Sequence, residues 1–389
     1  MSVFAELVGQ SHIVLALQDA VKASRNGEES QEMTHAWLFT GPPGSGRSSA
    51  AIAFAAALIC PEEGCGTCID CRSAQAGGHA DVEIVRTEGL SIKVDEIREL
   101  LQRVAWAPSL GGWRVVVMED ADRLTESAAN ALLKAIEEPG ARTVWLLCAP
   151  TLFDVLPTIR SRTRHLQLRT PSTQDVSDVL IRRDGISPGM AEFAARVSQG
   201  HIGRARHLAN DENIRSRRNT IMNLPFTLTS LSASFAAAAT LVELATQEAN
   251  SQSEARSEKE SHDLGQAWGQ GATGRGMASG GARALKELEK EQKSRATRMV
   301  RDSLDGALLD LATLYRDVMM VQTFSTVSTA STASLLNKEL EEKIIMMAER
   351  SRPEKIVEKL DAIMQARTNL SYNAAPLLTI EALMCALAQ

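Results

Sequence analysis

Aromatic side chains and excess positive charge are both scarce in this sequence. Phe, Trp and Tyr make up 4% of the 389 residues, and the formal net charge is −6. Proteins that hold single strands by base stacking use many aromatic side chains, and proteins that coat nucleic acid carry a basic surface. The composition therefore argues against a dedicated nucleic-acid-coating protein. Any contact with DNA has to come from a local basic patch or from partner proteins.

Long apolar runs are lacking as well. The longest, residues 50–60, is too short to span a bilayer, and the first ten residues have no basic cluster of the kind that opens a signal peptide. The six cysteines do not suggest a disulfide framework in a chain of this length. We expect a cytoplasmic protein without membrane contact, built from two or three domains.

Strand-like and helix-like segments alternate over residues 1–170. Short apolar runs predict strands at residues 36–40, 82–85, 114–118, 143–148 and 165–168, and amphipathic stretches between them predict helices. This alternation is typical of an α/β domain with a parallel sheet and flanking helices.

The remainder of the chain is predicted to be helical. Residues 171–210 have the length of a small helical lid domain, and Ser172 and Asp175 have capping-box spacing at its start. Residues 211–389 are predicted to form an all-α domain. Within it, residues 247–281 are rich in Ser, Gly, Glu and Gln, which predicts a flexible insertion.

A glycine-rich segment between the first strand and the next helix resembles a phosphate-binding loop. The pattern G-x-x-x-x-G-K-[ST] is present except that arginine replaces lysine; its residues are Gly41, Gly44, Gly46, Arg47 and Ser48. A planar guanidinium does not fit the slot of a lysine ammonium without moving the loop. We therefore expect a degenerate nucleotide site, in which binding of ATP and Mg²⁺ is doubtful. A glycine-rich turn without a ligand is the alternative.

Two acidic residues end the predicted strand at 114–118. In ATPases with this loop, an Asp at the strand tip helps to hold Mg²⁺ and an adjacent Glu polarises the attacking water. Here Glu119 precedes Asp120, which is the reverse order. Each carboxylate is then displaced by about one methylene, an error that is costly in catalysis. The alternative is a pair of solvated acids at the edge of the sheet.

Four cysteines lie within twelve residues, directly after the helix that follows the loop. They are Cys60, Cys65, Cys68 and Cys71. Four thiolates at such spacing are typical of a closed structural zinc site. An iron–sulfur cluster and four free thiols are the alternatives.

These features together resemble the AAA+ clamp-loader family of bacterial DNA polymerase III. Residues 124–139, LTESAANALLKAIEEP, are similar to a helix of that family, and residues 156–163, LPTIRSRT, resemble its Ser-Arg-Cys motif with Thr163 in place of cysteine. The resemblance covers residues 4–209 and implies an AAA+ domain with a zinc insert at 60–71, a lid at 171–210, and an oligomerising collar at 211–389. It implies motor (gamma/tau) and delta subunits as partners, and the sliding clamp and primed DNA through the complex.

Departures from the motor pattern favour the delta-prime branch of the family, whose nucleotide site is often degenerate. Besides Arg47 and the reversed acids, Gly203 stands where the motor has a phosphate-sensing arginine, and Ala149 and Pro150 replace a polar sensor. Arg204 follows one position late, about 100° away on a helix.

Arg162 lies in residues 156–163, the segment that resembles the family's Ser-Arg-Cys motif. The resemblance implies that it projects into the ATP site of a neighbouring subunit as an arginine finger. From the residues alone, Arg160, Arg162 and Arg164 could equally form a solvated basic strand edge. Two other functions stay open: an active ATP-hydrolysing motor subunit, and a zinc-containing nucleic-acid-binding module.

Overall fold

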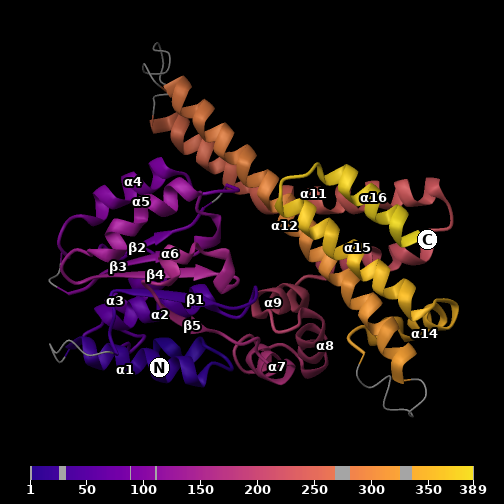
Figure 1. The fold of residues 1–389 in the computed structure, drawn as a ribbon, viewed down its shortest axis with the longest axis horizontal. Helices are drawn as coiled ribbons and strands as arrows, with labels where there is room; N and C mark the ends of the chain where they lie inside the picture. Colours follow the sequence, from indigo (N-terminus) through magenta and orange to yellow (C-terminus); the bar gives the residue numbers. More distant parts are fainter. Residues whose placement is uncertain are drawn as a thin grey trace. The chain divides into compact units, whose positions relative to one another are not determined.

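The structure is a computed structural model, and it divides the chain into two compact units, Met1–Asn210 and Asp211–Gln389 (Figure 1). We call them the N-terminal unit and the C-terminal unit. No helix in the described part of the chain is long and apolar enough to cross a membrane. The structure describes residues 2–25, 32–87, 89–109, 112–267, 281–324 and 335–388.

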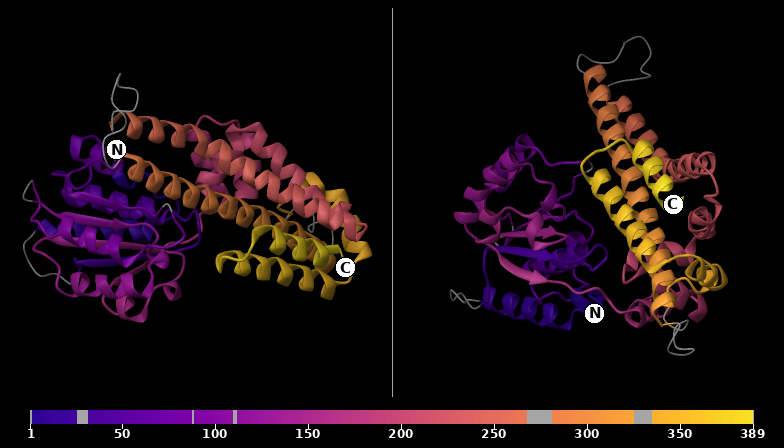
Figure 2. Two further views of the ribbon diagram at one scale, coloured as in Figure 1. Left: turned by 90° about the horizontal axis from the view of Figure 1, so that it is seen from above. Right: turned by 45° about the vertical axis from the view of Figure 1, so that its right-hand side comes forward.

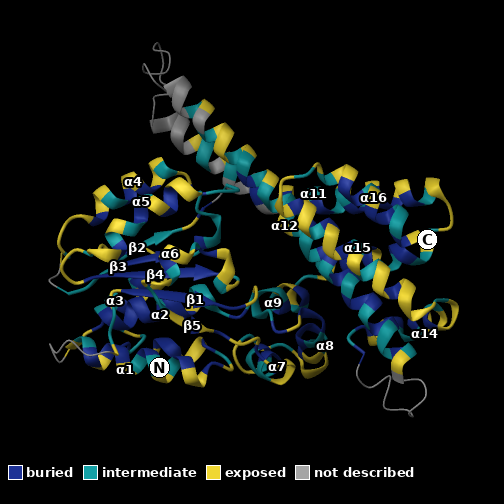
Figure 3. Ribbon diagram, in the orientation of Figure 1, coloured by how far each residue is buried: buried dark blue, intermediate teal, exposed yellow. Residues whose placement is uncertain are grey.

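A five-stranded parallel sheet forms the centre of the N-terminal unit. In spatial order its strands are β2 (Val82–Val85), β3 (Arg114–Met118), β4 (Thr143–Ala149), β1 (Ala36–Thr40) and β5 (Arg164–Gln167). Every residue of β1 and β4 is buried, as their continuous apolar sequences predict for central strands covered on both faces (Figure 3).

Helices cover both faces of this sheet, and each face has its own apolar core. Successive side chains of a strand point to opposite faces, so Phe39 joins one core and Leu38 the other. The Phe39 core includes α1 (Ser11–Arg25), α2 (Arg47–Ile59) and α3 (Ile69–Gln75). The Leu38 core includes α4 (Val94–Val104), α5 (Glu126–Glu137) and α6 (Pro157–Arg160).

Three short helices follow the sheet in the N-terminal unit, and we call them the lid helices: α7 (Thr173–Arg182), α8 (Pro188–Ser198) and α9 (Ile202–Asn210). The predicted capping box of α7 is confirmed. The Asp175 N–H donates to Ser172 Oγ at 3.1 Å, and the Ser172 N–H donates to Asp175 Oδ2 at 3.2 Å. These two bonds fix where the lid begins.

Single 3₁₀ turns connect the larger elements of this unit. They are η1 (Val3–Glu6), η2 (Ala121–Arg123) and η3 (Leu152–Asp154).

The C-terminal unit is helical throughout its described residues and has one apolar core. Two long helices, α11 and α12, pack against each other, and α15 and α16 pack along them (Figure 2). The elements are α10 (Glu212–Asn223), η4 (Leu224–Thr227), α11 (Leu231–Ala267), α12 (Gly281–Phe324), η5 (Lys338–Leu340), α14 (Glu341–Arg350), α15 (Pro353–Ser371) and α16 (Pro376–Ala388).

Part of the predicted flexible insertion is helical in the structure. Helix α11 continues to Ala267, whereas sequence composition predicted a flexible segment from residue 247. Polar contacts with α12 accompany the extension: Gln292 Nε2 donates to Ser257 O at 3.0 Å, and Arg295 forms an ion pair with Glu260 at 2.6 Å. A polar sequence is helical here because its side chains are paired across two helices. Residues 268–280 of the predicted insertion lie outside the described residues.

A buried ionic network links distant parts of the C-terminal unit. Arg218 of α10 is 7% exposed and donates to Asp310 Oδ1 of α12 at 3.1 Å and to Glu339 Oε1 at 3.0 Å. The Asn337 N–H donates to Asp317 Oδ2, also of α12, at 2.8 Å. Buried charges are tolerated only when they are paired in this way.

The predicted fold class is confirmed: a parallel sheet with flanking helices, a cysteine-containing insert and a helical remainder. The separate boundary predicted at 170/171 stays a prediction, because the lid helices belong to the same compact unit as the sheet.

Candidate functional site

The glycine-rich loop connects β1 to α2 and has the backbone geometry of a phosphate-binding loop. Gly44 and Gly46 have φ values of +82° and +90°, in the left-handed region that glycine adopts most easily. Gly46 is the N-cap residue of α2, which begins at Arg47. The N–H groups of its first turn, which includes Ser48, have no acceptor within the helix and can face an anion at the loop.

A cleft of about 850 Å³ adjoins this loop. It is lined by the N-terminal segment around Glu6, by the loop and the first turn of α2, and by the lid helices. Arg183, next to α7, forms an ion pair with Glu6 at 2.9 Å and so connects the lid to the N-terminal segment. Arg206 of α9 also lines the cleft, and its Nε donates to Asp184 Oδ2 at 2.6 Å.

The guanidinium of Arg47 interacts with protein groups at the ends of neighbouring strands. Its Nη1 atom is buried and has no hydrogen-bond partner among the described residues. Burial raises the pKa of Asp122, and the positive charge of Arg47 is among those that oppose this rise. Burial also raises the pKa of the Cys148 thiol, again opposed by Arg47. Arg47 thus lies close to the ends of β3 and β4.

The two predicted acids lie at the same edge of the sheet as the loop, and Glu119 has a partner within the chain. Glu119 forms an ion pair with Arg86 at 3.0 Å. Asp120 is the N-cap residue of η2, and its carbonyl accepts the Arg123 N–H at 3.0 Å. Asp122, which sequence reasoning did not single out, is the acid of this group whose pKa is raised, mainly by burial and then by the charge of Asp120.

The lid contacts the loop through a histidine that sequence reasoning missed. A Cβ atom added at Gly44 would lie 2.3 Å from Cγ of His201, so glycine is required for this contact. The Arg204 N–H donates to His201 Nδ1 at 3.2 Å. Burial lowers the pKa of His201, and the nearby charge of Arg204 lowers it further. Gly203 also lines the cleft, at the position where the motor pattern has a phosphate-sensing arginine.

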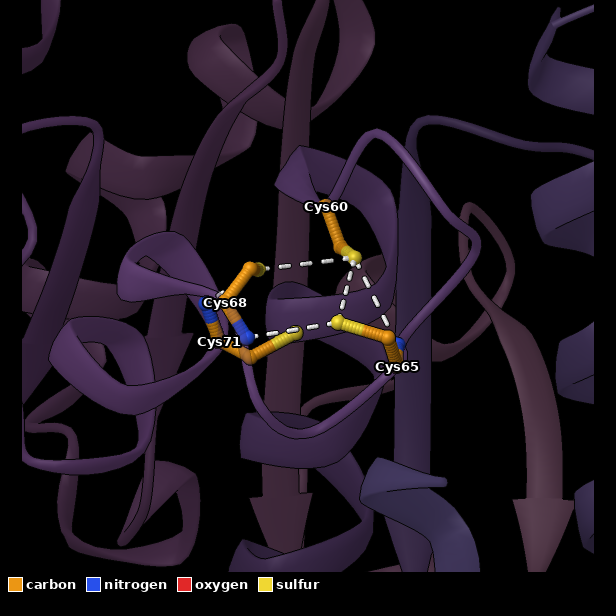
Figure 4. Close-up of side chains that lie close together, drawn as sticks. All are labelled: Cys60, Cys65, Cys68 and Cys71. Atoms are coloured by element: carbon orange, nitrogen blue, oxygen red, sulfur yellow. Dashed lines mark hydrogen bonds between the residues drawn. The ribbon is translucent and has the colours of Figure 1, made fainter. Parts of the chain in front are cut away.

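The four clustered cysteines converge on one point (Figure 4). Their sulfur atoms all lie within 4.8 Å of one another, and Cys60 Sγ is 3.7 Å from Sγ of both Cys65 and Cys68. Tetrahedral zinc with bonds of about 2.3 Å would place its sulfurs about 3.8 Å apart. The four thiols, completed by Cys71, therefore have the spacing of a tetrahedral metal site.

Backbone N–H groups point at these sulfurs and favour their ionised form. The N–H groups of Cys68 and Cys71 donate to Sγ of Cys65 and Cys68, each at 3.3 Å. The Thr67 hydroxyl, followed by the N–H groups of Thr67 and Cys68, lowers the pKa of Cys65 to about 6, whereas burial raises the pKa of Cys71. Metal binding requires thiolates, so these donors suit a metal ligand.

The cysteine insert also contacts the N-terminal segment. The Val3 N–H donates to Gly64 O at 2.9 Å, and a Cβ atom at Gly64 would lie 2.7 Å from Cγ2 of Val3. Arg25 of α1 donates to the carbonyls of Cys60 and Pro61. The insert is thereby joined to the segment that lines the cleft.

Three arginines around the start of β5 have different surroundings. Arg160 lies over the ring of Phe153 at 5.4 Å, and Arg164 lies over the ring of Trp37 at 4.9 Å. Arg162 instead forms an ion pair with Glu137, with Nε and Nη2 both 2.5 Å from Glu137 Oε1. The three residues therefore differ in the groups that they contact.

Arg162 lies at the opposite edge of the sheet from the phosphate loop. Arg164 pairs in register with Trp37 near the start of β1, whereas the loop follows Thr40 at the end of that strand. Parallel strands rise about 3.3 Å per residue, so the two features are separated by on the order of 10 Å or more. This register places Arg162 away from the phosphate loop of its own chain.

Comparisons with known proteins agree on one family. The profile of the family described as "DNA polymerase III, delta subunit" matches residues 17–172. The delta-prime subunit of DNA polymerase III from Bacillus subtilis is 32% identical over 204 residues, which are 52% of this chain and 62% of that protein. The gamma/tau subunit from Mycobacterium tuberculosis is 35% identical over 184 residues, 46% of this chain and 31% of that protein.

A solved structure gives a weaker match. A gamma-subunit-related protein of Thermotoga maritima aligns with 95% of this chain and 99% of its own, at 17% identity and a TM-score of 0.44. The chain spans less than two thirds of the length of the Bacillus and Mycobacterium subunits. Over residues 17–172 the chain is therefore similar to the family described as "DNA polymerase III, delta subunit", and it resembles the delta-prime and gamma/tau subunits of bacterial DNA polymerase III.

Proposed function

We propose that this chain acts as a delta-prime-type subunit of a DNA polymerase III clamp loader. It assembles with gamma/tau-type motor subunits and a delta subunit, and the complex loads a sliding clamp onto primed DNA. The names of its relatives, delta-prime and gamma/tau, support membership of such a complex. The cytoplasm follows as the place of action, since bacterial replication occurs there.

The chain itself hydrolyses little or no ATP. Glu119 is held by Arg86, Arg47 interacts with the strand ends, and Gly203 supplies no charge to the cleft. Phosphoryl transfer depends on positioned charges around the phosphates and Mg²⁺. The buried Nη1 of Arg47, the pairing of Glu119 with Arg86 and the missing charge at Gly203 support a structural role for the degenerate nucleotide site formed by residues 41–48 and the acids.

Arg162 acts on the ATP site of a neighbouring motor subunit. The observation that carries this proposal is its position, at the opposite sheet edge from the chain's own phosphate loop. Its side chain is 38% exposed, so another subunit can reach it. A planar guanidinium matches the charge that develops on a transferring phosphoryl group.

Replacing Arg162 tests the finger. In a complex reconstituted with the motor and delta subunits of the same bacterium, Arg162→Ala should leave assembly intact, because an exposed ion pair contributes little stability. Hydrolysis at the adjacent site should fall by roughly 10³-fold, with a smaller loss in the total rate because the other sites still act. Clamp- and DNA-stimulated ATPase activity and clamp loading are the measurements.

Three further variants sharpen this test. Arg162→Lys should restore part of the rate, since lysine supplies the charge without the bidentate fork. Arg160→Ala and Arg164→Ala should have milder effects, because these side chains rest on aromatic rings of their own subunit. If complexes with Arg162→Ala assemble and load clamps at the unmodified rate, the finger is excluded.

The retained loop geometry favours one other candidate, an active motor subunit. That function predicts ATP turnover by the purified chain, stimulated by DNA. A zinc-containing nucleic-acid-binding module predicts instead tight DNA binding by the chain alone with a steep salt dependence. The net charge of −6 argues against that module.

The metal site holds structural zinc. Four protein thiols at tetrahedral spacing leave no open coordination position, so zinc here would stabilise the insert and take no part in chemistry. The site would hold the Cys insert against the N-terminal segment through Gly64 and Val3.

Elemental analysis of the purified chain should find one zinc per molecule. Chelation should expose the cysteines to thiol reagents and loosen the insert, while the sheet stays folded, because a core of this size does not depend on one metal ion. Iron with visible absorbance, or a metal-free chain with the same protection of its thiols, would contradict zinc.

A further inference from the structure

Glu137 is the acidic partner of Arg162 within the described residues. Both Nε and Nη2 of the guanidinium lie 2.5 Å from Glu137 Oε1, and the two side chains are 38% and 45% exposed. Nη1 donates to Thr158 O at 2.8 Å and to Ser161 Oγ at 3.1 Å. Most of the donors that a finger would offer to a phosphate are therefore engaged inside the subunit.

The charge of Arg162 is neutralised as well. A carboxylate in direct contact with the guanidinium gives the pair a net charge of zero, so a neighbouring phosphate would meet little positive potential. Arg160 and Arg164 differ, because each lies over an aromatic ring. Arg162 stabilises developing negative charge only after it separates from Glu137.

The position of Glu137 makes the pair favourable in the free subunit. Glu137 is the last residue of α5, where the negative end of the helix dipole disfavours a carboxylate. A cation beside it offsets that cost. The pair is nevertheless exposed, and exposed ion pairs are weak and readily exchanged.

We propose that Glu137 is the resting partner of Arg162, and that Arg162 exchanges this carboxylate for the phosphate oxygens of nucleotide bound to the neighbouring motor subunit. This inference rests on the proposed finger. It adds a regulatory step: the free or unloaded complex keeps Arg162 neutralised, and a phosphate-loaded neighbour competes for it. Glu137 is thus a positioning residue that lowers hydrolysis until the complex is loaded.

The test uses the reconstituted complex with Glu137→Gln, which keeps a hydrogen-bond acceptor of the same size and removes the charge. ATPase activity is measured without DNA and clamp, and again with both. We expect the unstimulated rate to rise about two- to fivefold, the range that the strength of an exposed ion pair allows. The fully stimulated rate should stay unchanged, because Arg162 has then already left Glu137.

Two controls accompany this variant. Glu138→Gln removes the neighbouring charge of the same helix end and should leave the unstimulated rate unchanged. The double variant Glu137→Gln/Arg162→Ala should have the low rate of Arg162→Ala alone, because Glu137 acts only through Arg162. Thermal unfolding of each purified chain checks that the fold is intact.

The outcomes separate this inference from the finger itself. An unstimulated rate that stays the same or falls with Glu137→Gln, while Arg162→Ala abolishes hydrolysis at the adjacent site, overturns the resting-partner role and leaves the finger standing. A rise that persists in the double variant also overturns it. Full activity with Arg162→Ala removes both proposals.

Discussion

The phosphate loop and the sheet edge at Arg162 differ in how accessible their arginines are. At the loop, Nη1 of Arg47 is buried and has no hydrogen-bond partner among the described residues. At the edge, Arg162 is 38% exposed and pairs with Glu137, which is 45% exposed. The comparison teaches that the proposed role of Arg162 requires a guanidinium that another subunit can reach, whereas the guanidinium of Arg47 is partly enclosed in its own subunit.

Adding one methyl group at Gly44 should have the largest effect, because it disrupts the contact between the loop and His201. In Gly44→Ala the new Cβ would lie 2.3 Å from Cγ and 2.6 Å from Cα of His201, so the lid must move. We expect the free energy of unfolding of the N-terminal unit to fall by about 2–5 kcal/mol, from steric overlap together with left-handed backbone strain. Urea unfolding of the full chain measures the loss.

Gly46→Ala is the matched control. Its φ is +90°, but an added Cβ meets nothing within 4 Å. The loss should therefore be limited to backbone strain, about 1–2 kcal/mol. Equal losses for the two variants would show that the contact between His201 and the loop does not stabilise the lid.

Lowering the pH should weaken the contact between His201 and the loop, with a smaller loss of stability than Gly44→Ala causes. Burial lowers the pKa of His201 in the folded protein below its ordinary value of 6.5. The unfolded state then binds more protons as the pH falls through 6.5, so stability is lost from that pH downward and is fully present above it. We expect the unfolding free energy of the unmodified chain to fall more between pH 7 and pH 5 than that of His201→Gln.

The histidine variant separates this effect from other titrations. Burial also lowers the pKa of His165, whose ring contacts Thr40 at 2.6 Å, and that contribution is common to both proteins. Parallel pH profiles for the two chains would rule out His201 as the group responsible.

Restoring lysine in the loop should have the smallest effect. Arg47→Lys returns the residue type of an active loop, but Glu119 remains paired with Arg86 and Gly203 still supplies no cation. We expect no ATP turnover above background in the purified chain. Turnover that appears with Arg47→Lys and disappears when Ser48→Ala is added would mean that the cleft is one residue away from an active site.

Local signals in the sequence predicted the sheet well. The predicted strands 36–40, 82–85 and 114–118 coincide with β1, β2 and β3. Short apolar runs between turn residues report burial on both faces, which is a property of the segment itself. The four cysteines were likewise visible because their spacing is short. Long-range partners left no such signal: nothing adjacent to Arg162 indicates Glu137, and nothing near Gly44 indicates His201.

The prediction of a flexible segment from residue 247 did not anticipate the helical extension of α11, for a related reason. Composition over residues 247–267 reports a segment with too little apolar surface to fold alone. In the structure its polar side chains pair with those of α12, so Glu260 and Arg295 satisfy each other across two helices. A propensity computed along one segment does not contain the contribution of its partner.

The sequence by itself determined the parallel sheet, the loop with its altered lysine position, the four-thiol cluster and the motif that contains Arg162, because each is written in neighbouring residues. Only the tertiary structure decided how the charged groups are used. In the structure, Glu119 forms an ion pair with Arg86, and His201 packs against Gly44. Arg162 forms an ion pair with Glu137 at the sheet edge remote from the chain's own loop. These pairings depend on distances of a few ångströms between segments far apart in the chain, and electrostatic interactions and steric fit change steeply over such distances.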